Sequence, residues 1–384
     1  MTTICLTEAS APDLPPDDGR PPDHRGSWLP TGGMIATRFL ELRRRRGLMV
    51  ALLAVNIGLP VILLTVRLVS HAVDPRSYGP AGGYDVFTTL VAGILYIFGF
   101  IVAATVGCTT GSVDLTEGMF RHLVITGRSR LALYLARIPA GLAIVLPVVV
   151  LGFTIVCTVC VLAAPTQLSY DGLTVPAGLS RAGLEQWAGD HAGEVVCNFN
   201  YRGDIILNVP CGNGPGVGIA KVGPPQDGQP PAAPAQIRAL AVRMADQDYA
   251  DYHSHFLTPP LSLMVDTGLW ICLEATIGFV VGLGLASLMG QRTVPVVLLV
   301  ILELILTPIF SRHVIAHLID VQRAIVGLAM AHIEPARLPL PFAGGGGPND
   351  LLLPESRPVA VLVIVGWLGV WTALGAWRMV TRDA

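Results

Sequence analysis

The chain has few charged residues for its length and almost no lysine. Only 14% of its 384 residues are Asp, Glu, Lys or Arg, and the single lysine is Lys221. Soluble domains carry roughly 25% charged residues. Because 52% of the residues are hydrophobic and concentrate in long runs, the composition indicates an integral membrane protein instead of two or three soluble domains.

The sequence also lacks the motifs of an ATP site or a catalytic centre. A P-loop needs Gly-x-x-x-x-Gly-Lys-Ser/Thr, but Lys221 lies between Ala220 and Val222. The glycine-rich run 212–218 contains Pro215 and is predicted to be a flexible turn. We find no nucleophile elbow, catalytic triad signature or nucleic-acid motif. We therefore expect no enzyme activity, no catalytic residue, no nucleic-acid partner and no cofactor in this chain, and nucleotide hydrolysis would need a separate polypeptide.

Two groups of histidines and acids have spacings that could hold zinc. Their members are Asp248, Asp251, His253 and His255 in one group and His313, His317 and Asp320 in the other. A zinc-protease helix also needs a Glu general base beside its histidines, and neither group has one. We predict a solvated face next to the membrane and no metal site.

Six apolar runs are long enough to cross the roughly 30 Å hydrocarbon core as helices. They cover about residues 48–70, 86–110, 136–163, 263–289, 294–311 and 358–378. The predicted fold is an all-α polytopic membrane protein, with three spans in residues 34–163 and three in 263–384. Residues 1–33 are rich in Pro, Asp and Gly, so we expect a disordered cytoplasmic N-terminus and no secretory signal peptide.

Arginines that flank the spans gather on one side of the predicted membrane. They are Arg38, Arg43, Arg44, Arg45, Arg46, Arg121, Arg128, Arg130, Arg137, Arg292, Arg378 and Arg382. Cytoplasmic loops carry the excess of positive charge. Both termini are therefore predicted to be cytoplasmic, in a multi-pass protein of the cell membrane.

The longest loop on the other side, residues 164–262, is predicted to be an extracytoplasmic insertion. Residues 194–211 have the pattern of two short strands joined by a turn, which makes the insertion partly β. Cys197 and Cys211 flank this hairpin in an oxidising compartment, so we predict a disulfide between them; two free thiols are the alternative. Residues 236–256 are predicted to be helical.

The loop 312–334 has apolar residues spaced by three and four, interrupted by histidines and charges. We expect an external or re-entrant helix there. A seventh span is the competing interpretation.

Residues 33–47 form an amphipathic segment before the first span. Ile35, Phe39 and Leu42 lie at i, i+4 and i+7, and four arginines follow them. This pattern suits a helix in the membrane interface, with its apolar face in the lipid and its arginines near anionic headgroups. An ordinary positively charged flank is the alternative.

The predicted cytoplasmic turn after the second span is more apolar than a simple connection needs. Asp114 can cap a short helix whose first turn contains Glu117 and which Gly127 can end. Its apolar side is formed by Met119, Phe120, Leu123 and Val124, and Arg121 and Arg128 flank it. An exposed apolar surface of this kind suits docking into a groove on a partner protein.

These features resemble those of the membrane subunits (permeases) of type-2 ABC exporters. The segment from Phe39 to Arg46 is similar to their basic connecting helix. The turn fits their loose pattern at Asp114, Glu117, Gly118, Arg121, Leu123, Thr126, Arg128, Ser129, Arg130 and Arg137. The resemblance implies that this turn is the coupling helix, which rests on an ATP-binding subunit. Six spans with both ends inside and external helices between the last two also match the family.

The same resemblance implies the partners of the chain. They would be separate ABC ATPase subunits, which hold ATP and Mg²⁺, and a second permease copy or paralogue. The insertion 164–262 departs from the minimal pattern of the family, which leaves the substrate open.

Two carboxylates, Glu274 and Glu303, lie inside predicted spans at similar depth on consecutive helices. An ionised residue at the centre of a membrane helix costs roughly 2.5–3.5 kcal/mol, so such residues face a cavity or a partner. In one interpretation they form a polar patch in the substrate path. In the other, each makes a structural hydrogen bond to a neighbouring helix that involves Asn56 or Arg67.

The leading hypothesis is therefore the permease subunit of an ATP-driven ABC exporter, which forms the substrate path and couples to separate ATPases. The alternative is a polytopic scaffold or sensor whose outer loop binds a ligand without transport. A membrane enzyme is the third possibility and has little support from the residues.

Overall fold

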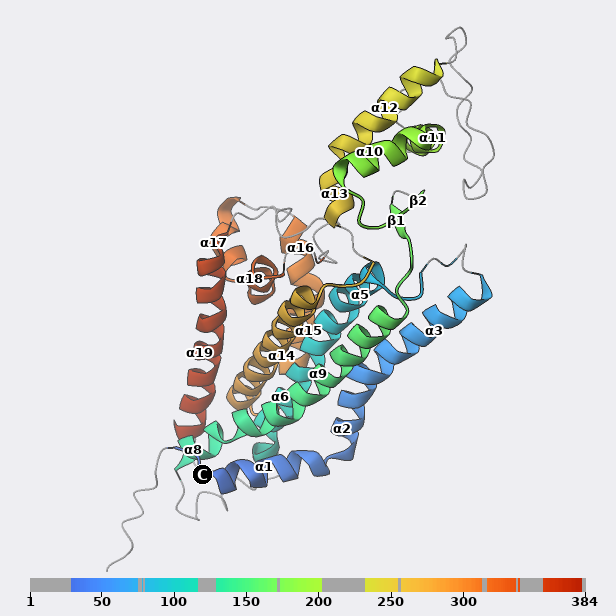
Figure 1. Ribbon diagram of the computed structural model, residues 1–384. Helices are drawn as coiled ribbons and strands as arrows, with labels where there is room; N and C mark the ends of the chain where they lie inside the picture. The colour runs from blue at the N-terminus through green and yellow to red at the C-terminus, as the bar shows by residue number, and fades with distance from the viewer. Residues whose placement is uncertain are drawn as a thin grey trace, which may run out of the picture.

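The protein is a bundle of long helices with a smaller helical unit beyond one end (Figure 1). The computed structural model describes residues 29–74, 78, 80–116, 129–170, 173–201, 232–254, 257–312, 316–335, 338 and 355–381. Among these residues, six helical stretches are long and apolar enough to cross a membrane. They are Arg46–Val73, Tyr84–Val113, Arg130–Leu162, Leu261–Met289, Thr293–Ser311 and Arg357–Thr381. The prediction of six apolar helices long enough to span a membrane is confirmed.

Three of the spans contain a short π-helical turn. The first consists of α2 (Arg46–Leu53), η1 (Ala54–Gly58) and α3 (Leu59–Val73). The second consists of α5 (Tyr84–Leu90), η2 (Val91–Leu95) and α6 (Tyr96–Thr116). The fifth consists of α15 (Thr293–Ile301), η3 (Leu302–Leu306) and α16 (Thr307–Arg312). The remaining spans are α8 (Arg130–Leu135) with α9 (Arg137–Leu162), α14 (Leu261–Met289) and α19 (Arg357–Thr381).

Helices α6 and α14 form the centre of the bundle, where glycines allow their backbones to meet. A Cβ atom at Gly107 would lie 2.1 Å from the carbonyl oxygen of Phe279, and one at Gly282 would lie 2.4 Å from that of Ala104. Small residues allow this close approach between membrane helices, where van der Waals packing replaces the hydrophobic effect. The surrounding helices α3, α15 and α19 leave many large apolar side chains exposed, as expected for surfaces that face lipid.

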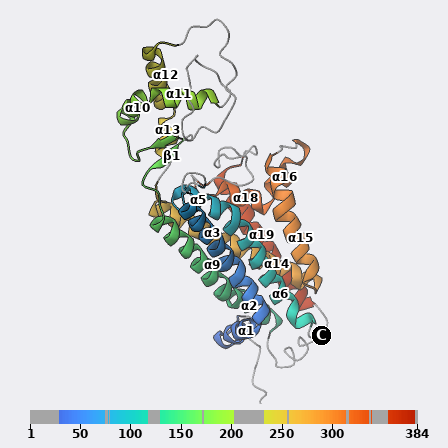
Figure 2. The same ribbon diagram turned by 90° about the vertical axis from the view of Figure 1, so that its right-hand side faces the viewer.

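The two ends of the bundle differ. Helix α1 (Gly32–Arg44) and the last turn of α19 lie at one end, which we call the terminal end (Figure 1). Helices α10 to α13 of the insertion lie at the other, the insertion end, in both views (Figure 1, Figure 2). The chain ends that the structure describes thus share one end of the bundle, as an even number of spans requires.

The described part of the insertion is mainly helical. It contains a small hairpin, β1 (Leu168–Tyr170) with β2 (Leu173–Val175), followed by α10 (Arg181–Asp190), α11 (Ala192–Tyr201), α12 (Pro234–Gln247) and α13 (Tyr249–Ser254). Helices α12 and α13 confirm the helical prediction for most of residues 236–256. The strand prediction for 194–211 is wrong where it overlaps α11, and residues 202–211 lie outside the described part. Val196 is buried against Ala241 and Met244 of α12, which explains why a β-branched run became a helix.

The segment between the fifth and sixth spans is broken into short helices instead of the single helix predicted for 312–334. It contains a 3₁₀ turn (Ala316–Leu318), α17 (Ile319–Arg323) and α18 (Val326–His332). Every residue of α18 is buried, and the Trp270 side chain of α14 donates a hydrogen bond to the Met330 carbonyl of α18, 3.1 Å away. The described residues of this segment contain no seventh span.

Helix α1 confirms the predicted helix before the first span, but its buried face differs from the prediction. Met34, Arg38 and Leu42 are the buried residues, whereas Ile35 and Phe39 are partly buried against the protein. Helix α1 thus packs its apolar face on the bundle as well as lying at the terminal end.

The glycine contact between α6 and α14 gives a matched pair of variants. We expect Gly107→Ala to lower the thermal unfolding temperature of the purified protein, because its new methyl group meets the backbone of α14. Gly99→Ala lies on the same helix with no atom within 4 Å of the new Cβ and should be neutral or stabilising. Equal stability of the two variants would mean that α6 and α14 are not in backbone contact.

Candidate functional site

Most of the predicted coupling turn lies outside the described residues. This holds for Glu117, Gly118, Met119, Phe120, Arg121, Leu123 and Arg128, so their role stays a prediction. Asp114 is described and lies within α6, which continues to Thr116. The prediction that Asp114 caps a separate short helix is wrong, because the second span extends past its apolar part into the polar segment.

The two ends of the turn are connected to the centre of the bundle. Arg137, at the start of α9, is 1% exposed and donates a hydrogen bond from Nη1 to the Gly111 carbonyl of α6, 3.3 Å away. The Ser287 hydroxyl of α14 also donates to this carbonyl, at 3.5 Å. A hydrogen bond from a charged donor is stronger than a neutral one. Residues before and after the turn are therefore fixed to the same point on α6 and α14.

Helix α8, directly after the turn, contacts the first and the last of the described helices. Ala132, Leu133 and Ala136 form a small apolar cluster with Met34 of α1. On another side, Arg130 donates a hydrogen bond to the Val380 carbonyl of α19, 3.1 Å away. Helix α8 thus connects α1 and α19 at the terminal end.

A cleft of about 560 Å³ opens between the first, second and fifth spans at the terminal end. Its lining includes the cations Arg45, Arg46 and Arg292 beside the apolar side chains of Leu48 and Val297. Positive charge above an apolar wall suits the headgroup region of a bilayer.

Glu274 and Glu303 both lie in the interior of the bundle. Glu274 of α14 is 1% exposed and Glu303 of η3 is 0% exposed, and the two carboxylates interact electrostatically. Tyr96, the first residue of α6, faces Glu303 with its hydroxyl. The ring of Tyr96 stacks on Trp270 with centroids 4.6 Å apart.

The structural hydrogen bonds suggested for these carboxylates are not formed with the partners proposed. Asn56 donates to the Leu52 carbonyl of its own helix at 3.0 Å, and Arg67 donates to the Tyr78 carbonyl at 3.2 Å. Neither oxygen of Glu303, nor Oε2 of Glu274, has a well-aligned hydrogen bond to any described residue.

Two further buried carboxylates lie near α18, where sequence reasoning did not predict a site. Burial raises the pKa of Glu334 to about 9. Burial also raises the pKa of Glu355, whereas the nearby His332 and Arg323 lower it, and Oε2 of Glu355 lies 3.6 Å from Nδ1 of His332. Glu334 lies just after α18 and Glu355 just before α19, and no periodic pattern distinguishes them from solvent-exposed acids.

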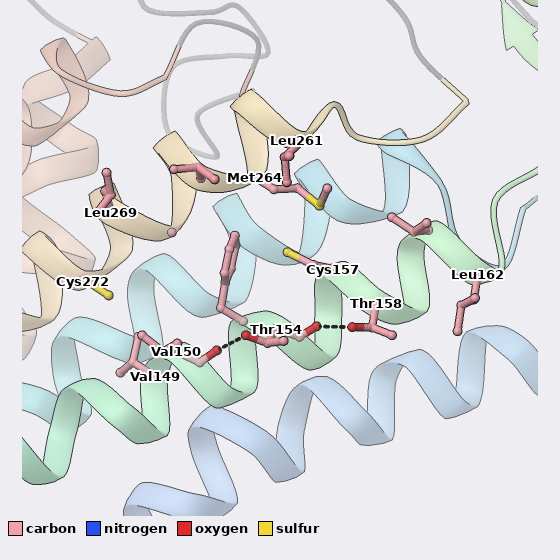
Figure 3. Close-up of a pocket in the computed structure, with 14 residues that line it drawn as sticks. Val149, Val150, Thr154, Cys157, Thr158, Leu162, Leu261, Met264, Leu269 and Cys272 are labelled. Carbon is pink, nitrogen blue, oxygen red and sulfur yellow. Dashed lines mark hydrogen bonds between the residues drawn. The ribbon is translucent and has the colours of Figure 1, made fainter.

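An apolar groove of about 590 Å³ runs between α9 and α14 (Figure 3). Cys157, Met264 and Cys272 are among its lining residues. The hydroxyl groups of Thr154 and Thr158 donate to carbonyls of their own helix, at 2.7 and 2.8 Å. The groove therefore offers an apolar surface to lipid or to another apolar group, and no polar anchor for a substrate.

Cys197 lies on α11, and Cys211 lies outside the described residues. The predicted disulfide between them stays a prediction.

The pKa of Glu334 predicts how stability depends on pH. Between its ordinary value near 4.5 and about 9, the folded protein holds a proton on Glu334 that the unfolded protein has lost. Stability must then fall as pH rises through this range. We expect Glu334→Gln to make the fall in thermal unfolding temperature with pH shallower, because the glutamine side chain does not take up this proton. An equally steep fall in Glu334→Gln would contradict the assignment.

Comparisons with protein-family models, with curated proteins and with solved structures find no match to this chain.

Proposed function

We propose that the chain is the permease subunit of an ATP-driven ABC exporter. In this proposal it forms the substrate path with a second permease and couples to separate cytoplasmic ATPases that bind ATP and Mg²⁺. The chain itself has no P-loop, since its only lysine, Lys221, is not part of one.

The observation that carries the proposal is the packing of α1 on α8 at the terminal end. The amphipathic helix before the first span and the helix directly after the turn 117–128 share the cluster of Met34, Ala132, Leu133 and Ala136. In the resemblance stated above, these elements correspond to the connecting helix and the helix that follows the coupling helix. A partner that pushes on the turn would therefore move both.

Hydrogen bonds from Arg137 to Gly111 and from Arg130 to Val380 offer a route for that movement. They join the turn to α6 and α19, and α6 packs on α14. Packed helices transmit a displacement as a rigid body and do not deform continuously. Closure of the ATPases would thus reach the centre of the bundle, where Glu274 and Glu303 lie.

The insertion favours a second candidate, a sensor whose outer loop binds a ligand without transport. It has its own small cores, one around Leu184 and Tyr252 and one around Val196 and Met244. Arg238 and Asp190 add an ion pair at 3.3 Å between α12 and α10. A module with its own core can bind a ligand by itself. Isolation of this protein from its membrane without an ATPase partner would favour the sensor function.

The exporter proposal predicts that Phe120 and Leu123 bind the ATPase. Burial of a large apolar side chain contributes about 1.5–3 kcal/mol, so the double variant Phe120→Ala, Leu123→Ala should weaken the complex by about two to four orders of magnitude. Co-purification of the ATPase and transport-linked ATP hydrolysis should both fall.

The matched control is Leu318→Ala, Val321→Ala, which removes two exposed apolar side chains at the insertion end. It should keep the ATPase, as should Glu303→Gln, which changes the bundle interior. If the turn variant keeps its full complement of ATPase, the turn is an ordinary connection. Loss in all three variants would indicate a general folding defect and would remove this support for the turn.

The proposal also requires the terminal end to face the cytoplasm. A cysteine introduced by Gly127→Cys should react with a membrane-impermeant thiol reagent only after the cells are opened. A cysteine introduced by Gly193→Cys in α11 of the insertion should react in intact cells, because a side chain there meets no atom within 4 Å. Labelling of the first variant in intact cells would reverse the orientation.

A further inference from the structure

Four glutamates are buried around α18 and in the interior of the bundle with little positive charge to neutralise them. Glu274, Glu303 and Glu334 are each at most 1% exposed, and the side chain of Glu355 is 0% exposed. Of the four, Glu355 is the one that interacts with basic side chains of the described residues. These side chains are His332 and Arg323. Within the described part of the chain, the electrostatic partners of Glu274 and Glu303 are each other and Tyr96.

Three of the four carboxylate oxygens of this pair have no hydrogen-bond donor among the residues that the structure describes. Both oxygens of Glu303 and Oε2 of Glu274 are buried without a well-aligned hydrogen bond to a described residue. A buried ion without a partner is very costly, and the group usually becomes neutral instead. Two carboxylates close together in apolar surroundings do not both ionise, and they titrate as a unit.

A polar side chain that is not acidic also points into this pair. Tyr96, from a different helix, is 1% exposed, and its hydroxyl faces Glu303. The phenol can donate one hydrogen bond to a carboxylate. With Tyr96 as the single donor, at least one further carboxylate oxygen of the pair still lacks a hydrogen bond. A proton on one of the two carboxyl groups would supply the missing donor.

We propose that Glu274 and Glu303 form a site that binds one proton, shared between the two carboxylates inside the bundle. The proton comes from water and bonds to one carboxylate oxygen, and the resulting O–H donates to the other carboxylate. The charge of the pair changes from −2 to −1, and the Tyr96 hydroxyl donates to the anion that remains. The site does not depend on the exporter proposal, because it rests only on the packing of α6, α14 and η3.

A metal ion is a poorer occupant than a proton. Within the described part of the chain, no group of three or more His, Cys, Asp or Glu side chains is arranged to hold one. The surroundings of the carboxyl groups are also close-packed. A Cβ atom at Gly327 of α18 would lie 3.2 Å from Oε2 of Glu303 and 2.7 Å from Oγ1 of Thr307, so α18 lies directly against Glu303.

The titratable groups that face the pair suggest where the proton enters. They are Tyr96 of α6 and, through its interaction with Tyr96, Glu334 after α18. Because burial raises the pKa of Glu334 to about 9, this carboxyl group is protonated at neutral pH. Chains of protonatable side chains in membrane proteins commonly carry protons. The proton would then reach Glu303 from the insertion end, past α18.

Infrared spectra of the purified full-length protein at neutral pH test the proposal. The double variant Glu274→Gln, Glu303→Gln should lose one protonated-carboxyl C=O stretch and one ionised-carboxylate stretch relative to wild type. Each single variant should lose only the carboxylate stretch, because a lone carboxyl group in apolar surroundings keeps its proton. The control Thr154→Val, on the exposed side of α9, should keep both stretches of the wild type, because it removes no carboxyl group.

Three results would overturn the shared proton. Loss of two carboxylate stretches and no protonated band in the double variant would mean that both groups are ionised. Loss of two protonated bands would mean that each group holds its own proton. A protonated band that appears only when choline replaces sodium in the buffer would make the site a sodium site. If the double variant does not fold, each single variant can be compared with the wild type instead. Loss of the protonated-carboxyl stretch in a single variant also contradicts the proposal.

Discussion

Between α6 and α14 the two backbones approach so closely that no side chain fits at Gly107 or Gly282. In hydrocarbon, apolar side chains gain nothing by leaving lipid for protein, so helices associate through van der Waals packing and interhelical hydrogen bonds. Every other span is arranged around this pair. Helix α9 joins it through the hydrogen bond from Arg137 to Gly111, and α19 packs its Trp371 backbone against Gly284 of α14.

This central packing relates the two functional candidates to the same pair of helices. At the terminal end, the same stretch of α6 that meets α14 leads directly into the turn 117–128. In the bundle interior, α6 begins with Tyr96 and α14 carries Glu274, so the carboxylate pair is bounded by the same two helices. The π-helical turn η2 ends directly before Tyr96, and the π-helical turn η3 contains Glu303. Such turns often occur at functional sites. A change at the turn and a change in protonation could therefore influence each other through α6.

Much of this architecture could be predicted from the sequence, because lipid imposes strong rules. The apolar runs located all six candidate spans, since a helix is the simplest way to satisfy backbone polar groups in hydrocarbon. Glu274 and Glu303 could be singled out because they are acidic residues inside these runs. The limits of the prediction are equally physical. Residues 194–201 have the composition of a strand but fold as α11, because tertiary contacts with α12 outweigh local propensity. The burial of Glu334 and Glu355 depends on α18 folding back onto Trp270, a contact between distant segments that no local pattern reveals.

The coupling of this chain to an ATPase is the central claim about its function. Its most direct test is to purify the tagged chain from the membrane of its own cells in lipid nanodiscs and to measure ATP hydrolysis and subunit composition together. The account predicts an ATP-binding subunit in fixed ratio to the chain and hydrolysis that stops when that subunit's P-loop lysine is replaced. A folded chain that is isolated alone, with no ATP hydrolysis, would contradict it.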